Sequence, residues 1–407
     1  MDKKPQETKN NPANILKNRA IAEVIEKENL IKKLNLGKGL RIKFGADPSR
    51  PDLHLGHSII LKILRSFQNA GHTIIFVIGD YTAMIGDPSG KSKTRPALSK
   101  KEAEQNAKTY FDQVKTILDV KKTEVRFNSE WFSVMALDAV LQLTSRFTVA
   151  RILERDDFAK RLNNNTDIGA QELLYPMMQA FDSVVLSADV EIGGTDQKFN
   201  MLAGRELQKK MGQTPQDIIM TKILVGTDGK EKMSKSLDIF ISLGEQPQNM
   251  HAKIMSVSDG TMMDYFELLS DFSDEEIAGI KNELKNEKIN PKKIKEKLAR
   301  HIVSFYYGKK KADEANNEFN RVFTEKESPK NIEKEVLIKK EETLLTLIRR
   351  SSLVKSNAQI HRLFKQGAID VDGEKIEDPL AKITVPAKDG VVVRIGKKIF
   401  FKIKPGK

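Results

Sequence analysis

Two strand-like segments flank one amphipathic helix early in the chain, and this pattern limits the fold more than any other. Residues 40–44 alternate in polarity and end at Gly45, while Thr73–Ile78 is a continuous apolar run rich in β-branched residues. Between them, apolar residues recur at helical spacing from Ser58 to a stop at Gly71. A strand, a helix and a strand at this spacing predict a βαβ unit, and the second run predicts a buried parallel strand.

The alternation of helix and strand continues for more than 200 residues. We expect a helix over residues 14–34, a helix opened by the capping-box pair Ser99 and Glu102, and a strand over 123–127. A further helix is expected over 170–182 and a strand over 184–192. Residues 1–225 are therefore predicted to form a doubly wound, Rossmann-like α/β domain with a parallel sheet.

The second half of the chain has a different character. Residues 262–325 are charged and helical in pattern, which predicts an α-helical domain over 226–328. A Lys/Glu-rich stretch over 329–340 is typical of a linker. Residues 341–407 predict a small α+β domain of two short helices followed by small strands, with a hairpin turn at Asp372-Gly373.

Composition narrows the function. Lys and Arg number 69 against 56 Asp and Glu, and this net charge of +13 favours a polyanionic partner such as nucleic acid, or an acidic membrane face. The chain has no cysteine, which excludes disulfides, thiolate metal sites and a cysteine nucleophile. The first residues lack the apolar core of a signal peptide, and no apolar run is long enough to span a bilayer, so we expect a cytoplasmic protein without a membrane partner.

The segment His54-Leu55-Gly56-His57 lies between the first strand and its helix. The backbone N–H groups and dipole of a helix start suit a polyanion. Two histidines three residues apart share one face of the turn and can both donate to phosphate. Gly56 would let a flat base approach the backbone. This context favours a nucleotide site over a chance motif or half a metal site.

A second segment, Lys232-Met233-Ser234-Lys235-Ser236, follows a strand-like stretch and a polar turn. We expect an exposed, movable loop whose two lysines fold over a triphosphate and neutralise the charge on departing pyrophosphate.

Residues 86–92 have the composition of a phosphate-binding P-loop. The required first glycine would fall at position 85, which is Ile85, so the match is one residue short. We therefore reject a Walker-type NTPase and expect a polar turn at the carboxyl end of a strand, where α/β enzymes bind ligands.

In this order and separation, the histidine and lysine segments resemble the two ATP signatures of class I aminoacyl-tRNA synthetases. Asp47-Pro48-Ser49, residues 86–91, the run from Tyr175 to Asp182, and residues 193–197 together resemble bacterial tyrosyl-tRNA synthetases over most of the first 240 residues. The resemblance implies that tyrosine is activated by ATP to tyrosyl-adenylate and then transferred to tRNA(Tyr). It also implies a homodimer, Mg²⁺ that arrives bound to ATP, no protein metal site and no prosthetic group.

The same resemblance assigns roles to individual residues. Catalytic side chains on the phosphates would be His54, His57, Lys232, Lys235 and Ser236. ATP would be held by Asp47, Gly56, Gly194, Asp196 and Lys235. Tyrosine would be held by Gly45, Asp87, Tyr175, Gln179, Asp182 and Gln197, with Asp182 accepting the hydrogen bond of the phenol. Phosphate or tRNA-end contacts would come from Lys91 and Arg95.

One residue departs from the family pattern. Lys43 stands where many family members carry a tyrosine that shares the phenol contact, and a charged lysine cannot accept a hydrogen bond. Tryptophanyl-tRNA synthetase is therefore an alternative reading, and a catalytically silent RNA-binding paralogue is another.

The C-terminal segment points towards tyrosine. Residues 356–373 resemble the small RNA-binding domain first named from a ribosomal protein, which bacterial tyrosyl enzymes carry and tryptophanyl enzymes generally lack. Its basic residues could engage tRNA phosphates without reading bases: Arg349, Arg350, Lys355, Arg362 and Lys365.

Overall fold

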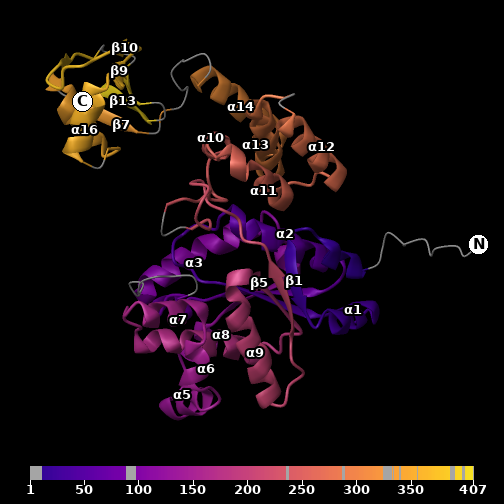
Figure 1. The fold of residues 1–407 in the computed structure, drawn as a ribbon. Helices are drawn as coiled ribbons and strands as arrows, with labels where there is room; N and C mark the ends of the chain where they lie inside the picture. Colours follow the sequence, from indigo (N-terminus) through magenta and orange to yellow (C-terminus); the bar gives the residue numbers. More distant parts are fainter. Residues whose placement is uncertain are drawn as a thin grey trace, which may run out of the picture. The chain divides into compact units, whose positions relative to one another are not determined.

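The computed structural model describes residues 12–88, 98–234, 238–286, 289–323, 332, 334–338, 341–354, 356–385, 390–396 and 399–406. The chain divides into two compact units, residues 1–306 and 307–407, and each is described by itself (Figure 1). None of the helices within these ranges is long and apolar enough to cross a membrane.

The first unit is built on a six-stranded sheet in the order β1-β6-β5-β2-β3-β4. Its strands are β1 (Ile21–Ile25), β2 (Arg41–Ala46), β3 (Thr73–Ile78), β4 (Thr123–Phe127), β5 (Val190–Gly194) and β6 (Asp217–Thr221). Strands β2 to β6 are parallel, and β1 pairs antiparallel with β6. The predicted doubly wound α/β fold is confirmed.

Helices cover both faces of this sheet. The crossover helices α2 (Leu55–Asn69) and α9 (Lys198–Lys210) lie on opposite sides of it (Figure 1). β2 connects to β3 in one direction along the sheet, and β5 connects to β6 in the other. Because crossovers between parallel strands are almost always right-handed, the two helices are expected on opposite faces. The strand order therefore reverses between β2 and β5, and the carboxyl ends of these two strands define the switch point of the fold.

The remaining helical segments of the first unit connect the strands or follow the sheet. Those within the sheet domain are η1 (Pro12–Lys17), α1 (Lys27–Asn35), η2 (Thr82–Met84), α3 (Lys100–Val114), η3 (Val120–Lys122), α4 (Ser129–Phe132), α5 (Leu137–Thr144), α6 (Val149–Leu153), α7 (Asp156–Asn163), η4 (Ala170–Leu173), α8 (Tyr175–Val185) and η5 (Thr195–Gln197). Those after it are α10 (Pro247–Met255), α11 (Asp259–Leu269), α12 (Asp274–Lys285) and α13 (Pro291–Tyr307). The predicted capping box is present, since Ser99 accepts from Glu102 N–H and Glu102 accepts from Ser99 N–H.

Two sequence predictions in this unit are wrong. The helix expected over 14–34 is a 3₁₀ turn, strand β1 and helix α1, because Glu26 adopts a left-handed backbone (φ 61°) and the β-branched residues before it pair with β6. The strand expected from residue 184 begins at Val190, because residues up to Val185 continue helix α8.

The second unit begins with α14 (Lys309–Phe323) and contains a five-stranded sheet in the order β10-β9-β12-β13-β7. Its strands are β7 (Glu335–Ile338), β9 (Ile369–Val371), β10 (Glu374–Lys375), β12 (Val391–Ile395) and β13 (Ile399–Pro405), with β8 (Glu342–Thr343) and β11 (Lys382–Ile383) as a separate pair. The hairpin at Asp372-Gly373 is confirmed, and both residues have positive φ.

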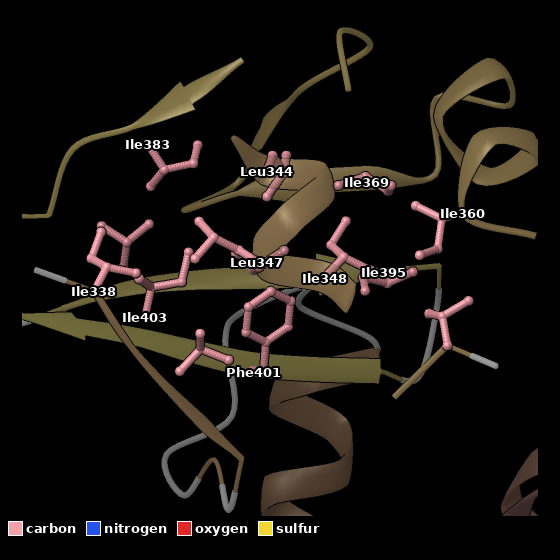
Figure 2. Packing of buried hydrophobic residues seen from close by; sticks show 14 of the residues in the cluster. Ile338, Leu344, Leu347, Ile348, Ile360, Ile369, Ile383, Ile395, Phe401 and Ile403 are labelled. Atoms are coloured by element: carbon pink, nitrogen blue, oxygen red, sulfur yellow. The ribbon is translucent and has the colours of Figure 1, made fainter. Parts of the chain in front are cut away.

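Helices α15 (Leu344–Ser351) and α16 (Asn357–Lys365) close an apolar core in the second unit. Leu347, Ile348 and Phe401 lie at its centre (Figure 2). Part of the stretch predicted as a linker belongs to this domain, because Val336 and Ile338 are buried and β7 pairs with β13. The buried residues of 335–338 alternate with exposed ones, as in a strand with one face on the core, so this segment forms a strand although its neighbours in the sequence are charged.

Candidate active site

A cavity of about 250 Å³ opens at the carboxyl ends of the parallel strands, at the switch point of the sheet. It brings together residues from segments that lie far apart in the sequence, between Lys43 and Ser234. The predicted site residues that line it are Gly45, Asp47, His54, Gly56, His57, Asp87, Tyr175, Gln179, Asp182, Gly194, Asp196, Gln197 and Lys232. The predicted residues Lys91, Arg95, Lys235, Ser236 and Lys355 lie outside the described residues.

The two histidines form the start of helix α2. His54 is the N-cap, its Nδ1 accepts from Gly56 N–H at 3.2 Å, and His57 Nδ1 accepts from His54 N–H at 3.2 Å. Because each Nδ1 is an acceptor, a neutral ring carries its proton on Nε2. Both imidazoles are thereby set as Nε2–H donors on the wall of the cavity.

This geometry corrects one expectation. The first N–H groups of α2 were expected to face a polyanion, but Leu55 N–H donates to Ile241 O and the N–H groups of Gly56 and His57 are taken up within the turn. For this turn, phosphate binding remains a prediction for the two imidazoles. Gly56 has a local role as well, because a Cβ there would lie 3.0 Å from the His54 ring.

The lysine segment continues from a tight hairpin. Lys232 bridges to Val225, Met233 N–H donates to Leu224 O, and Lys232 Nζ lies 2.6 Å from Asp196 Oδ2. The expected exposure is wrong for Met233 and Ser234, which are buried. Their burial anchors the segment at the cavity and places Lys232 beside Asp196, one of the predicted ATP contacts.

Tyr175 and Asp47 form a linked pair. The hydroxyl of Tyr175 donates to Asp47 Oδ2 at 2.9 Å, and Thr82 Oγ1 donates to Asp47 Oδ1 at 2.8 Å. Burial, together with the charge of Asp47, raises the pKa of Tyr175 well above its usual value. Tyr175 is therefore a fixed neutral phenol whose oxygen can accept from an ammonium group. Thr82 was not among the residues predicted from the sequence.

Gly79 leaves the space that the Asp47 carboxylate occupies. A Cβ on Gly79 would lie 2.1 Å from Asp47 Oδ1 and 2.5 Å from Thr82 Oγ1. We expect Gly79→Ala to displace the carboxylate and to lower the free energy of unfolding by about 1–3 kcal/mol, with a loss of activity. Urea denaturation measures this change.

The matched control for Gly79 is Gly279→Ala on the exposed face of α12, where an added Cβ meets no atom within 4 Å. Alanine favours a helix, so this control should gain about 0.5–1 kcal/mol. A Gly79→Ala protein as stable and active as the wild type would contradict the steric role of Gly79.

Asp182 is a buried acceptor at the base of the cavity. Trp131 Nε1 donates to its Oδ1 at 3.0 Å, and Asn128 provides a further hydrogen bond. Burial raises the pKa of Asp182 to about 7, against the opposing effect of the Lys43 ammonium. Sequence reasoning missed both donors, because each follows strand β4 at a distance in the chain and only the fold brings them beside α8.

A chain of side-chain amides runs along one wall. Gln197 Nε2 donates to Asp87 Oδ2 at 2.9 Å, and Asn200 Nδ2 donates to Oε1 of both Gln197 (2.9 Å) and Gln179 (3.0 Å). Gln179 Nε2 in turn donates to Glu191 Oε1 at 3.1 Å. Asn200 and Glu191 were not predicted, although a charged residue within the apolar strand β5 was a signal that could have found the second.

The basic residues of the second unit are not equivalent. Arg362 and Lys365 are exposed on α16, and Arg349 is exposed but donates to Asn357 Oδ1 at 2.6 Å. Arg350 joins elements of its own domain, with bonds to Glu342 Oε1 (2.5 Å) and Leu337 O (2.7 Å).

Comparisons of the sequence and of the fold with known proteins indicate one class of enzyme. The model of the class I tRNA synthetases for tryptophan and tyrosine matches residues 35–324. The fold resembles that of a truncated mitochondrial tyrosyl-tRNA synthetase from Aspergillus nidulans (TM-score 0.62, 19% identity, covering 77% of this chain and 94% of that one). It also resembles the Archaeoglobus fulgidus tyrosyl-tRNA synthetase solved with L-tyrosine (TM-score 0.59, 21% identity, 75% and 98% covered). The fold and site therefore define a class I aminoacyl-tRNA synthetase.

Full-length relatives narrow this class. The tyrosine–tRNA ligase of Oleidesulfovibrio alaskensis is 48% identical over 95% of this chain and 96% of its own length. That of Thermotoga maritima is 45% identical over the same shares. The chain belongs to the bacterial tyrosyl-tRNA synthetases.

Proposed function

We propose that this chain activates tyrosine with ATP and transfers it to tRNA(Tyr) through the residues of the cavity. The observation that carries the proposal is one cavity with a buried acceptor, Asp182, at its base and the imidazoles of His54 and His57 on its wall. Such a site can hold a phenol and a triphosphate together. A buried acceptor that phenylalanine would leave unpaired favours tyrosine.

The chemistry of activation requires positioning more than proton transfer. The tyrosine carboxylate is already a nucleophile and attacks the α-phosphate in line, so tyrosyl-adenylate forms and pyrophosphate leaves. We assign the substrate α-ammonium to Tyr175, Gln179 and Asp87. The imidazole Nε2–H groups and Lys232 stabilise the charge on the phosphates.

ATP binding to Asp196 changes the surroundings of Lys232. The Asp196 carboxylate would accept a hydrogen bond from a hydroxyl of the ATP ribose. In the structure, Asp196 Oδ2 lies 2.6 Å from Lys232 Nζ. A ribose hydroxyl that shares this carboxylate would release Lys232 towards the phosphates. We propose that Mg²⁺ arrives bound to ATP and that the reaction uses no prosthetic group.

The second step uses tRNA. A hydroxyl of the 3′-terminal ribose attacks the adenylate carbonyl and releases AMP. We assign phosphate contacts of the tRNA to the exposed Arg362 and Lys365, and to Arg349, in the C-terminal domain. We place the reaction in the cytoplasm, where its three substrates occur together.

The test of this function is ATP–pyrophosphate exchange with a panel of amino acids, followed by charging of tRNA(Tyr). Exchange with tyrosine and none with phenylalanine at equal concentration is expected. Exchange with tryptophan in place of tyrosine would favour the tryptophanyl alternative. RNA binding without any exchange would favour a catalytically silent paralogue.

We further propose that the chain forms a homodimer through the apolar surface around α5. Four aliphatic side chains there are more than half exposed: Val134 (79%), Leu137 (73%), Leu141 (61%) and Val149 (59%). Exposed apolar side chains gathered on one segment are typical of an interaction surface.

Charged substitutions test the dimer. Leu137→Glu combined with Leu141→Glu should change the sedimentation mass from twice the 46.0 kDa chain mass to a single chain mass. Leu36→Glu is the matched control, because Leu36 is 80% exposed and lies on a different segment of the same unit. A control that also dissociates the dimer, or a double variant that remains dimeric, would argue against this surface.

A further inference from the structure

Lys43 is the residue at which this chain departs from the commoner family pattern, and its fully buried side chain belongs to the lining of the cavity. Its ammonium has three protons and three acceptors: Gln179 O at 2.9 Å, Ser183 Oγ at 2.7 Å and Glu191 Oε1 at 3.0 Å. Because a lysine ammonium donates three hydrogen bonds, these acceptors use all of them. None remains for the substrate phenol.

The Glu191 carboxylate is likewise surrounded by hydrogen-bond donors. Besides Lys43, it accepts from Gln179 Nε2 (3.1 Å), Ser183 Oγ (3.2 Å) and Gln216 Nε2 (2.5 Å). A carboxylate with 2% exposure requires such partners, since a buried charge without them is strongly disfavoured. Lys43 and Glu191 thus form one buried ion pair that joins β2, β5 and α8.

The pair sets the orientation of a substrate-binding amide. Glu191 accepts from Gln179 Nε2, so Gln179 Oε1 points the other way, where Asn200 Nδ2 donates to it. Asn200 is itself oriented, because its Oδ1 accepts from the buried Arg155 at 3.1 Å. The carboxamide of Gln179 is therefore held with its oxygen available to an ammonium group.

We propose that the Lys43–Glu191 pair is a positioning device of the tyrosine pocket: it fixes the Gln179 amide for the substrate α-ammonium and holds α8, which carries Asp182, against β5, without touching the substrate. This inference rests on the proposed tyrosine activation. Lys43 therefore belongs to a buried scaffold in the wall of the pocket, and its three hydrogen bonds are all made within the protein.

The pair also acts on Asp182 through its charges. The Lys43 ammonium favours the ionised form of Asp182 and the Glu191 carboxylate disfavours it. The other groups that face Asp182 are Trp131 and Asn128, which donate to it, and Tyr175 on its own helix. Removal of Lys43 and removal of the Glu191 charge should consequently shift the pH dependence of tyrosine binding in opposite directions.

The test uses Lys43→Met, Glu191→Gln and their combination in the full chain, with KM measured by pyrophosphate exchange. Each single variant should raise KM for tyrosine at least about tenfold and leave KM for ATP within about twofold, because the ATP contacts are elsewhere. The midpoint of the tyrosine KM against pH should rise in Lys43→Met and fall in Glu191→Gln. The double variant should recover part of the loss, since no buried charge is left unpaired.

Lys33→Met is the matched control, because Lys33 pairs with the fully buried Asp217 at 2.9 Å and neither lines the cavity. It should lower stability without changing KM for tyrosine. Ser183→Ala, which removes one acceptor of the Lys43 ammonium, provides a milder variant if a charge substitution prevents folding. It should raise KM for tyrosine while KM for ATP stays unchanged.

Two results would overturn the inference. One is a Lys43→Met enzyme that loses stability like the control but keeps its tyrosine KM. The other is a pH midpoint that moves the same way in both single variants. A wild-type enzyme that fails to exchange with tyrosine would instead count against the proposed function, so the two failures are distinguishable.

Discussion

Asp182→Asn is expected to make the protein more stable and the enzyme much worse. Burial raises the pKa of Asp182 from 3.8 to about 7, so ionising this carboxyl costs more in the folded chain than in the unfolded one. At about 1.4 kcal/mol per pKa unit, the neutral asparagine should add up to about 4 kcal/mol to the free energy of unfolding.

The gain in the free energy of unfolding from Asp182→Asn should depend on pH in one direction. Well below the unfolded-state pKa of 3.8, the carboxyl group is protonated in both the folded and the unfolded chain, so the wild type carries no penalty. The penalty grows as pH rises towards the folded-state pKa of about 7 and is constant above it. Denaturant titrations at pH 5 and pH 8 should therefore give a larger gain for Asp182→Asn at pH 8. An equal gain at both values would contradict the assignment.

The same substitution should weaken tyrosine binding. A hydrogen bond to a charged acceptor contributes about 1.5–3 kcal/mol, so KM for tyrosine in pyrophosphate exchange should rise about 10- to 100-fold. KM for ATP should stay near the wild-type value. A residue that lowers the stability of the fold would thus be the one that recognises the substrate, which is the usual cost of a buried functional charge.

Lys232→Met is expected to reduce the rate of activation about 100- to 1000-fold with little effect on KM for tyrosine. Within the described residues of the loop segment, Lys232 is the lysine that lines the cavity. Negative charge on the departing pyrophosphate develops only during the reaction, so an interaction between this charge and the Lys232 ammonium would stabilise the transition state. The ion pair with Asp196 is partly exposed, so its loss should change stability by no more than about 1 kcal/mol. Single-turnover formation of the adenylate measures the rate.

The control for Lys232 is Lys230→Met in the same hairpin, because Lys230 is exposed and does not line the cavity. It should leave the rate unchanged. Equal losses in both variants would indicate a general effect of charge rather than a specific contact.

Local patterns in the sequence were sufficient to predict secondary structure wherever the structure of a segment depends mainly on its own residues. The apolar run Thr73–Ile78 correctly predicted a buried parallel strand, and Ser99 with Glu102 correctly predicted the start of α3. The prediction of one helix over residues 14–34 was wrong because the apolar spacing at Ile21 and Val24 is compatible with a helix as well as with a strand. Pairing with the edge of β6, a contact almost 200 residues away, decided between them.

The motifs of the site were visible in the sequence for the same reason: a histidine pair at a helix start and a polar face at 175, 179 and 182 are local patterns. They indicated the family and predicted which residues would touch the substrates. What only the tertiary structure decided is the state of those residues. The tautomers of His54 and His57, the raised pKa of Asp182 and the three acceptors around Lys43 arise from burial and from partners distant in sequence. A sequence specifies which groups a site contains, but solvation and neighbouring charge, which set their chemistry, exist only once the chain has folded.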